Sequence, residues 1–447
     1  MMWSRAVLFS ALLWTASSFH HQVACNRRWP AFRATTAEEA SVGERISTAT
    51  SAAELLAVEP LLIHPGEETK VHQHQLVHQR KRQRHATSVL ARLVKYVIGV
   101  EVNNERGSAV ASEAFRRLVV CATAGVGPSG HATPWVDEDT DVASYVECVR
   151  ALGALAPLPE ACLAAARPLF EHFDAALPRT LHLSPAKLSA VEWAGRRLFL
   201  SAEYQGISAA HSALKLPFRV LHALAKDVVS LDAIKKEVKF KQDLLTTRDG
   251  RTVSERRETC WMADPGIGGL SYSGKIMIPF PFTESIARVR DVIEAETGIY
   301  YDCCLINHYA DGECACKYHS DPEHGTYWAY DTVVVSIGET RRFNLRAIGG
   351  AGEQEPHSFH LYSGDVFYMF RDCQDAFQHA VLKSENAATN NAPRASIVFK
   401  MSLPGPGGRR GHGLSKNQPA KPPPAGRPTS APRKPRSPPG PRATKIK

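Results

Sequence analysis

Residues 332–382 read TVVVSIGETRRFNLRAIGGAGEQEPHSFHLYSGDVFYMFRDCQDAFQHAVL, and this pattern is typical of antiparallel β-strands. Apolar or aromatic side chains recur at every second position in short runs, and glycines separate the runs. A later run, RASIVFKMSL, alternates in the same way. The predicted strands are 332–337, 341–348, 358–362, 365–371, 376–382 and 394–403. Six strands at this spacing indicate a two-sheet sandwich or jelly roll.

Two histidines and one acid, in and just before this region, form a possible metal-binding set. His319 and Asp321 are two residues apart, and such residues of a strand point to the same side. His379 belongs to a later predicted strand, where Phe377 and Val381 share its side. Two histidines and a carboxylate on one face bind Fe(II) and leave positions open, as a non-heme oxygenase requires. A His-x-Asp pair alone is common by chance, so the interpretation depends on the whole set.

The last predicted strand adds a possible anion-binding residue. Its apolar residues occupy one face, and Arg394, Ser396, Val398 and Lys400 occupy the other. An arginine in the mouth of a barrel needs a carboxylate partner, which its guanidinium binds through two hydrogen bonds. The distal carboxylate of 2-oxoglutarate fits this requirement. Taken alone, Arg394 could equally be a surface or salt-bridged residue.

Residues 216–403 resemble the AlkB family of Fe(II)/2-oxoglutarate-dependent dioxygenases, and within it the alkylated-DNA-repair type. The similar segments are YSGK (272–275), LINHYADGE (305–313), HSDPE (319–323), GETRRFNLR (338–346), SGDVFYMF (363–370), FQHAV (377–381) and PRASIVFK (393–400). The resemblance implies an α+β fold, in which a double-stranded β-helix (jelly-roll) dioxygenase domain follows an all-helical region. It also implies Fe(II), 2-oxoglutarate as co-substrate, and O2.

The resemblance assigns roles to individual residues. It implies His319, Asp321 and His379 as the catalytic iron ligands, and Arg394 as the residue that binds 2-oxoglutarate through a salt bridge. The further co-substrate positions are Asn307, Tyr309, Ser396 and Lys400. Lys400 stands where the family has arginine, which keeps the charge and loses the two-pronged geometry.

Three residues match substrate-contacting positions of the family: Tyr272, Glu323 and Arg341. A flipped base stacks on aromatic side chains, which gives Tyr272 a function in a base pocket, although a core position explains it as well. Glu323 could be a surface acid and Arg341 a solvated strand residue. Residues 244–269 are no general motif of the family, and we expect them to form a substrate lid.

The expected activity is oxidative demethylation of N-alkylated bases in DNA or RNA, as in DNA repair, with release of formaldehyde, succinate and CO2. One alternative is a 2-oxoglutarate dioxygenase that hydroxylates a protein or a small molecule, because a fold does not fix a substrate. Another is an RNA-binding helical protein with a non-catalytic dioxygenase-like domain.

The chain ahead of the predicted enzyme domain changes character twice. Residues 1–18 are typical of a signal peptide, and we interpret residues 19–85 as a disordered transit segment and linker. This leader predicts an organellar, plastid location, with the nucleus or the mitochondrion as alternatives. Residues 86–215 show helical periodicity and predict either a generic bundle or a helical-hairpin repeat.

The formal charge of +9 is unevenly distributed. Residues 404–447 hold 11 Lys or Arg and 12 Pro but no Asp or Glu, so the first 403 residues carry a formal −2. This composition predicts a disordered basic tail that aids nucleic-acid binding through release of counterions. None of the ten cysteines lies in a C-x2-C pair, which argues against a structural zinc module. We expect a monomer without a transmembrane segment in the mature chain.

Overall fold

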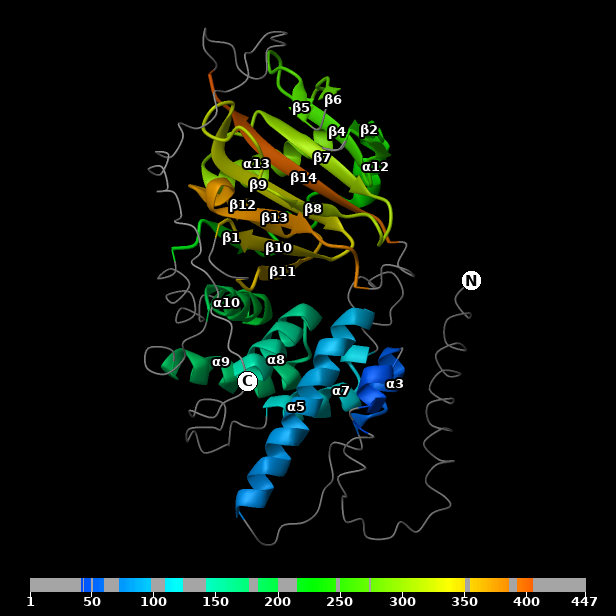
Figure 1. The fold of residues 1–447 in the computed structure, drawn as a ribbon, viewed down its shortest axis with the longest axis vertical. Coiled ribbons are helices and arrows are strands. Elements are labelled where there is room, and N and C mark those ends of the chain that lie inside the picture. Colours follow the sequence, from blue (N-terminus) through cyan, green and yellow to red (C-terminus); the bar gives the residue numbers. More distant parts are fainter. Residues whose placement is uncertain are drawn as a thin grey trace, which may run out of the picture.

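The computed structural model separates helices from strands along the chain (Figure 1). It describes residues 42, 44–49, 51–59, 72–97, 109–123, 142–176, 184–199, 215–246, 250–272, 275–349, 354–385 and 392–404. The described helices before residue 200 gather at one end of the molecule, and the strands after residue 217 form the other end. This arrangement is the predicted α+β class.

The larger sheet has six strands in the order β1-β12-β9-β14-β7-β4, and every neighbouring pair is antiparallel. Its strands are β1 (Phe218–Leu221), β4 (Glu258–Ala263), β7 (Cys303–Tyr309), β9 (Trp328–Gly338), β12 (Val366–Met369) and β14 (Arg394–Ser402). The long strands β9, β14 and β7 form its centre, so side chains on these three strands are held rigidly.

The smaller sheet has four antiparallel strands in the order β11-β10-β13-β8. They are β8 (Cys316–His319), β10 (Arg341–Ala347), β11 (His357–Leu361) and β13 (Phe377–Val381), and the short helix α14 (Cys373–Ala376) precedes β13. The two sheets pack face to face through aromatic side chains: Phe343 and Phe359 of the smaller sheet contact Phe367 of the larger, with ring centres 4.6 and 5.6 Å away.

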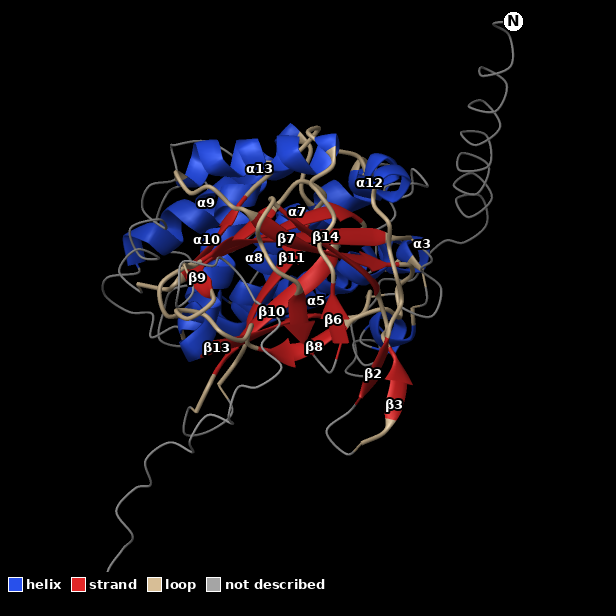
Figure 2. Ribbon diagram, turned by 90° about the horizontal axis from the view of Figure 1, so that it is seen from above, coloured by secondary structure: helices blue, strands red, loops and turns tan. Residues whose placement is uncertain are grey.

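Two helices cover the outer face of the larger sheet (Figure 2). They are α12 (Leu231–Glu237) and α13 (Glu284–Thr297). Ile286, Val289 and Ile293 of α13 are fully buried in one cluster with residues of β4, β7, β9 and β14. The helix ends at Gly298, whose left-handed backbone (φ 71°) favours glycine.

Two small hairpins lie at the edge of this body. One pairs β2 (Leu244–Thr246) with β3 (Thr252–Ser254), and the other pairs β5 (Leu270–Tyr272) with β6 (Lys275–Met277). The expected lid at 244–269 is therefore divided, because its part from Glu258 to Ala263 is β4, a buried strand of the larger sheet.

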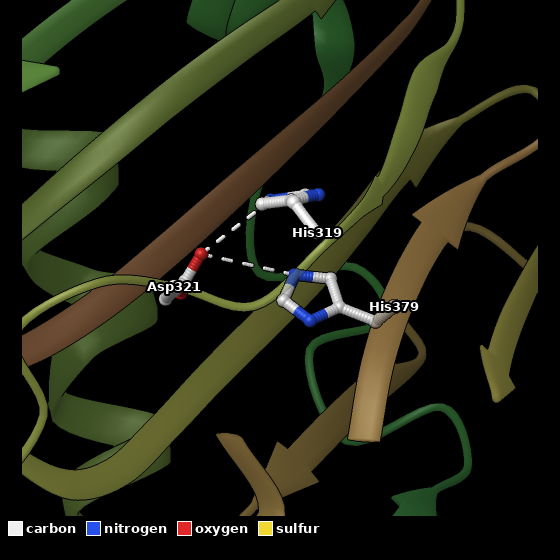
Figure 3. Close-up of side chains that lie close together, drawn as sticks. All are labelled: His319, Asp321 and His379. Atoms are coloured by element: carbon white, nitrogen blue, oxygen red, sulfur yellow. Dashed lines mark ion pairs between the residues drawn. The ribbon is translucent and has the colours of Figure 1, made fainter. Parts of the chain in front are cut away.

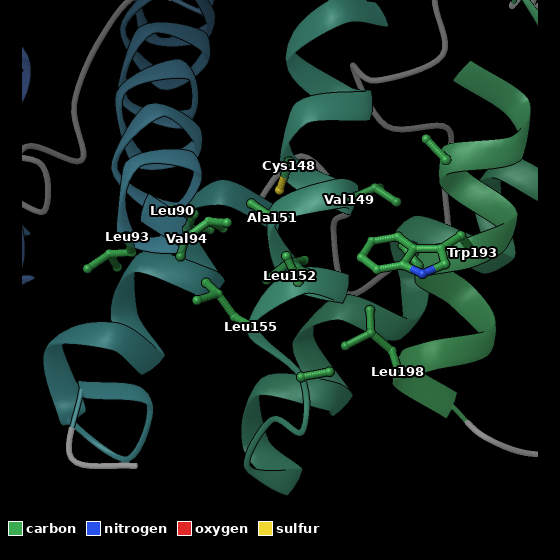
Figure 4. Close-up of a cluster of buried hydrophobic side chains, with 14 of the residues drawn as sticks. Leu90, Leu93, Val94, Cys148, Val149, Ala151, Leu152, Leu155, Trp193 and Leu198 are labelled. Atoms are coloured by element: carbon green, nitrogen blue, oxygen red, sulfur yellow. The ribbon is translucent and has the colours of Figure 1, made fainter. Parts of the chain in front are cut away.

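The helical end consists of α3 (Ala52–Leu56), α5 (His72–Val97), α7 (Glu113–Thr123), α8 (Val142–Leu155), α9 (Glu160–Ala176) and α10 (Pro185–Phe199). Figure 4 shows the apolar side chains that join α5, α8 and α10. Trp193 and Leu152 are nearly inaccessible there. At the start of α10 the Ser184 hydroxyl accepts a hydrogen bond from Lys187 N (3.3 Å) and so caps the helix.

The disordered linker expected up to residue 85 is not what the structure shows for two of its segments. Residues 52–56 form α3, and the basic run at 80–84 lies inside the 26-residue helix α5. Leu55 is fully buried, and Gln83 donates a hydrogen bond to the carbonyl of Ala122 (3.3 Å). Contacts with the other helices bury residues of both segments, and the polar sequence gives no sign of this burial. The predicted leader (1–18) and all but the first residue of the predicted tail lie outside the described residues.

Within the part of the chain that the structure describes, no helix combines the length and the apolar character that crossing a bilayer requires.

Candidate active site

The three predicted iron ligands lie within reach of a single ion (Figure 3). His319 ends β8, Asp321 follows it, and His379 lies in β13 directly opposite His319 in the register of the two strands. One potential ligand atom from each of them lies within 4.8 Å of the others. The antiparallel pairing of β8 with β13 therefore brings together residues that are 60 positions apart in the sequence.

The carboxylate of Asp321 uses its two oxygens differently. Oδ1 lies 3.5 Å from Nε2 of His319 and 3.8 Å from Nε2 of His379. Oδ2 accepts a hydrogen bond from Nζ of Lys400 at 2.6 Å. The backbone N–H of Asp321 donates to Oε1 of Gln374 (2.9 Å) in α14, which fixes the turn after β8. One oxygen is thus aimed at the histidines while the other is held by a buried lysine.

Hydrogen bonding and stacking orient both imidazoles. Nδ1 of His319 donates a hydrogen bond to the carbonyl oxygen of Lys317 (2.8 Å), so Nε2 is the nitrogen that is directed toward Asp321. The ring of His379 lies nearly parallel to Phe343, with ring centres 5.6 Å apart and an interplanar angle of 16°. Both Nε2 atoms consequently face the same space.

The charges of the cluster follow from burial and neighbours. Burial would raise the pKa of Asp321, but Lys400 and the two histidines outweigh it and hold that pKa well below the ordinary value. Burial lowers the pKa of His379 to about 3. Burial would also lower the pKa of His319, yet the bonds to Asp321 and Cys316 raise it to about 11. At neutral pH the cluster therefore holds an ionised carboxylate, one neutral imidazole and one imidazolium.

Arg394 lies in the same barrel as a fully buried guanidinium. Its Nε donates to Oγ of Ser336 at 3.2 Å. Its terminal nitrogens, Nη1 and Nη2, are buried without a hydrogen-bond partner among the described residues. Tyr309 is close by, with its ring centre 5.1 Å from Cζ of Arg394. Burying such donors without an acceptor is costly, so the site is complementary to a small carboxylate that arrives from solution.

The strand register places the other predicted co-substrate residues beside Arg394. Tyr309 of β7 is opposite Arg394 of β14, and Asn307 is opposite Ser396. Nδ2 of Asn307 donates to Oγ of Ser396 at 3.2 Å, whereas Oδ1 of Asn307 is buried and finds no partner among the residues described. A polar strip thus runs along two central strands on the face that looks into the barrel.

Lys400 occupies the far end of this strip. Its side chain is 6% exposed, and its close contacts are Oδ2 of Asp321 at 2.6 Å and Nε2 of His324 at 3.4 Å. The resemblance to the AlkB family places Lys400 among the co-substrate residues. In the structure its ammonium instead donates a hydrogen bond to Asp321.

The three predicted substrate residues differ in their position in the fold and in their burial. Glu323 lies in the turn after Asp321 with a left-handed backbone (φ 69°), and its carbonyl accepts hydrogen bonds from Tyr327 and Trp328. Tyr272 lies in β5, but its side chain is outside the described residues.

The expectation that Arg341 contacts substrate is wrong. Its side chain is 1% exposed, forms an ion pair with Glu339, and donates to the carbonyl oxygens of Asp311 and Cys314. The guanidinium therefore stabilises the loop before β8 and does not face solvent. The alternation of polar and apolar residues along β10 does not predict this burial. An arginine in a strand is expected to face solvent, and backbone carbonyl acceptors leave no pattern in the sequence.

Sequence reasoning missed two residues that support the iron-binding face. Gln374 is buried and orients the backbone of Asp321. Cys316 lies with Sγ 3.7 Å from Nδ1 of His319. The position of Cys316 three residues before His319 in the short strand β8 was the one available signal for a contact.

Comparisons with known proteins show the family to which the chain belongs. Residues 220–401 match the model of the 2OG-Fe(II) oxygenase superfamily. The chain is 37% identical over 169 residues to an uncharacterized protein of Acanthamoeba polyphaga mimivirus, which covers 38% of this chain and 85% of that protein. It is 25% identical over 198 residues to the DNA oxidative demethylase ALKBH2 of Bos taurus (43% of this chain, 70% of that protein).

Two further similarities are with a human protein and with a solved structure. The human alpha-ketoglutarate-dependent dioxygenase alkB homolog 3 is 25% identical over 185 residues, which cover 40% of this chain and 62% of that protein. A solved structure described as that of OsALKBH1 aligns with a TM-score of 0.30 and 17% identity, over 42% of this chain and 98% of that one.

Fold, site and sequence together define a non-heme iron oxygenase. The chain belongs to the 2OG-Fe(II) oxygenase superfamily, as an AlkB-like member. It is therefore a 2-oxoglutarate/Fe(II)-dependent dioxygenase, and the cofactor set of that superfamily is Fe(II), 2-oxoglutarate and O2.

The residues of this chain fit that cofactor set. Two neutral Nε2 lone pairs and one carboxylate oxygen are a suitable donor set for Fe(II) once His319 has lost its proton. The unpartnered Nη1 and Nη2 atoms of Arg394 suit the distal carboxylate of 2-oxoglutarate.

Proposed function

We propose that this enzyme oxidatively demethylates N-alkylated bases in nucleic acid, with the barrel forming a double-stranded β-helix. The observation that carries the proposal is the shared face on which His319, Asp321 and His379 converge in the same barrel as the buried Arg394. The choice of nucleic acid is supported by relatives named DNA oxidative demethylase.

The roles of the residues follow from their positions. His319, Asp321 and His379 hold the iron, and Arg394, Asn307, Tyr309 and Ser396 hold 2-oxoglutarate. When bound, Fe(II) and 2-oxoglutarate would activate O2, one oxygen atom of which would hydroxylate the N-methyl group while the other enters succinate as 2-oxoglutarate loses CO2. The resulting hydroxymethyl group leaves as formaldehyde and restores the base.

The chain's own contribution is orientation and charge. Lys400 keeps Asp321 ionised and fixes the rotation of its carboxylate. The Lys317 carbonyl keeps the proton of His319 on Nδ1, so Nε2 is the nitrogen that binds metal. Glu323, in the turn that follows Asp321, would accept a hydrogen bond from an amino group of the base.

The direct test incubates the full chain with Fe(II), ascorbate, 2-oxoglutarate and methylated DNA or RNA oligonucleotides. Mass spectrometry should detect restored bases in at least one series. His379→Ala should abolish repair, and His360→Ala is a matched control because His360 lies on the outer side of the smaller sheet against Trp193. Succinate without any repaired base would favour a protein or small-molecule substrate, and absence of succinate would favour a non-catalytic binding protein.

Two parts of the proposal concern segments that the structure does not describe. The basic residues 404–447 hold the nucleic acid loosely, so deleting them should reduce the salt dependence of binding. The leader directs the protein to an organelle, the plastid in the first instance, which a fluorescent fusion of residues 1–85 would test.

A further inference from the structure

Lys275 is a buried lysine outside the iron-binding cluster. Its side chain is 8% exposed, and its ammonium donates to Oε2 of Glu255 at 2.6 Å and to Oγ1 of Thr259 at 2.9 Å. Oδ2 of Asp243 lies 3.2 Å from the same nitrogen. Its three hydrogens are thus directed at three oxygens that belong to separate segments of the chain.

These partners come from both hairpins and from the larger sheet. Lys275 is the first residue of β6, Asp243 immediately precedes β2, and Glu255 immediately follows β3. Thr259 lies in β4, where it pairs with Asn307 of β7, a predicted co-substrate residue. A single ammonium therefore ties the β2–β3 hairpin and the β5–β6 hairpin to the sheet that holds 2-oxoglutarate.

The contacts continue from Glu255 toward the metal-binding face. Oε1 of Glu255 forms an ion pair with Nε of Arg257 (3.3 Å). The guanidinium of Arg257 lies near Cys316, and Sγ of Cys316 lies 3.7 Å from Nδ1 of His319. Figure 2 shows both hairpins on the side of the molecule that carries β8. Neighbouring polar and charged side chains thus extend from the hairpins toward His319.

Taking charges out of water is costly, and here two cations and two carboxylates meet with little exposure. The side chains of Asp243, Glu255, Lys275 and Arg257 are 13%, 4%, 8% and 14% exposed. A packed apolar cluster could hold two short hairpins at a lower cost in desolvation free energy. We therefore interpret this cluster of charged side chains as one that fixes a defined geometry of the two hairpins.

We propose that Lys275 is a positioning residue, which fixes both hairpins relative to the iron-binding face so that a substrate held between them reaches the reacting centre. The inference rests on the proposed function, because it concerns delivery of that substrate. Lys275 is not a catalytic residue, since it touches none of the iron-binding side chains.

The test compares the full-length wild type with Lys275→Met, Lys275→Arg and Lys241→Met. Lys241 is the matched control: it pairs with the same Asp243 (2.7 Å), but its side chain is 78% exposed. Amide hydrogen exchange is followed at 243–254 and at 275–277, together with the dissociation constant of 2-oxoglutarate and steady-state kinetics on a methylated oligonucleotide.

We expect Lys275→Met to accelerate exchange in both hairpins together by about tenfold or more. KM for the oligonucleotide should rise by about tenfold, with 2-oxoglutarate binding unchanged within about twofold. Lys275→Arg should recover most of the loss, because it restores the charge, and Lys241→Met should resemble the wild type.

Several results would overturn the inference: faster exchange in the β5–β6 hairpin alone, an unchanged KM, or a weakened affinity for 2-oxoglutarate. If Lys275→Met does not fold, Glu255→Gln replaces it, because it keeps the shape and removes one charge; unchanged exchange in this variant would equally contradict the proposal. A wild type that repairs no oligonucleotide refutes the proposed function, whereas the exchange experiment still decides whether Lys275 fixes the hairpins.

Discussion

Asp321 shows how a buried carboxylate can remain ionised while one of its oxygens faces two histidines. Its Oδ1 faces both histidines, and its Oδ2 is held by Lys400 at 2.6 Å. Arg394 presents the opposite situation, a buried cation whose two terminal nitrogens have no partner among the described residues. The carboxylate of Asp321 finds its hydrogen-bond donor within the protein. The guanidinium of Arg394 is left able to bind the carboxylate of a ligand.

The protonation of His319 predicts how iron binding depends on pH. Without metal the pKa of His319 is raised to about 11, chiefly by Asp321 acting against burial, while that of His379 is lowered to about 3 by burial. Between pH 6 and pH 8, Fe(II) therefore displaces one proton, and its apparent affinity should rise by about tenfold per pH unit. Anaerobic titration with proton-release detection measures this slope; an affinity independent of pH would contradict the assignment.

The unpartnered guanidinium of Arg394 predicts a specific defect. Arg394→Met should weaken 2-oxoglutarate binding by about 10- to 150-fold, because a charge-assisted hydrogen bond contributes roughly 1.5–3 kcal/mol. Iron affinity should remain, since Arg394 makes no contact with His319, Asp321 or His379 in the structure. Calorimetry with each ligand separates the two effects. Arg346→Met is a matched control, because Arg346 is exposed and binds Gln378; equal losses in both variants would refute the role.

Secondary-structure elements differ in how well the sequence reveals them. The six predicted strands correspond to β9, β10, β11, β12, β13 and β14. β4 and β7 were not predicted as strands because both of their faces are buried, between the core and α13. Their sequences ETCWMA and CCLINHY therefore do not alternate between polar and apolar residues. His319 and His379 could be paired in advance by spacing and resemblance, whereas the burial of Arg341 depends on backbone carbonyls that no periodicity encodes.

The turn between β11 and β12 predicts a sharp effect on stability. Gly364 has φ +89°, and an added Cβ would lie 2.6 Å from the backbone of Lys226. Gly364→Ala should lower the free energy of unfolding, measured by urea denaturation, by more than the roughly 1–3 kcal/mol that the positive φ alone costs. Gly349→Ala is the control, because φ is +75° but nothing lies within 4 Å of its Cβ, so only the backbone cost applies. An equal loss in both variants would show that the close approach is unimportant.

At the scale of the whole molecule, the helical end and the barrel share one hydrophobic core. Oγ of Ser189 in α10 lies 2.7 Å from Nδ1 of His357 in β11, and the Tyr362 hydroxyl donates to the carbonyl of Ala154 in α8. Trp193 packs against His222 and His360, with ring centres 6.4 and 6.0 Å apart. The bundle thus supports the smaller sheet, on which His319 and His379 lie.

This shared core predicts coupled unfolding. Trp193→Ala should cost roughly 3–5 kcal/mol of stability. It should also lower the melting temperature reported by helical circular dichroism and by loss of 2-oxoglutarate binding to the same extent. Helices that melt while the co-substrate is still bound would show that the two parts unfold independently.

The central claim is tested most directly by the stoichiometry of turnover on a single-stranded N-methylated oligonucleotide. With the full chain, Fe(II), O2 and 2-oxoglutarate, we predict one formaldehyde and one restored base for each succinate formed, all lost in Asp321→Ala. Succinate that accumulates at the same rate with or without the oligonucleotide, and without formaldehyde, would contradict a nucleic-acid demethylase.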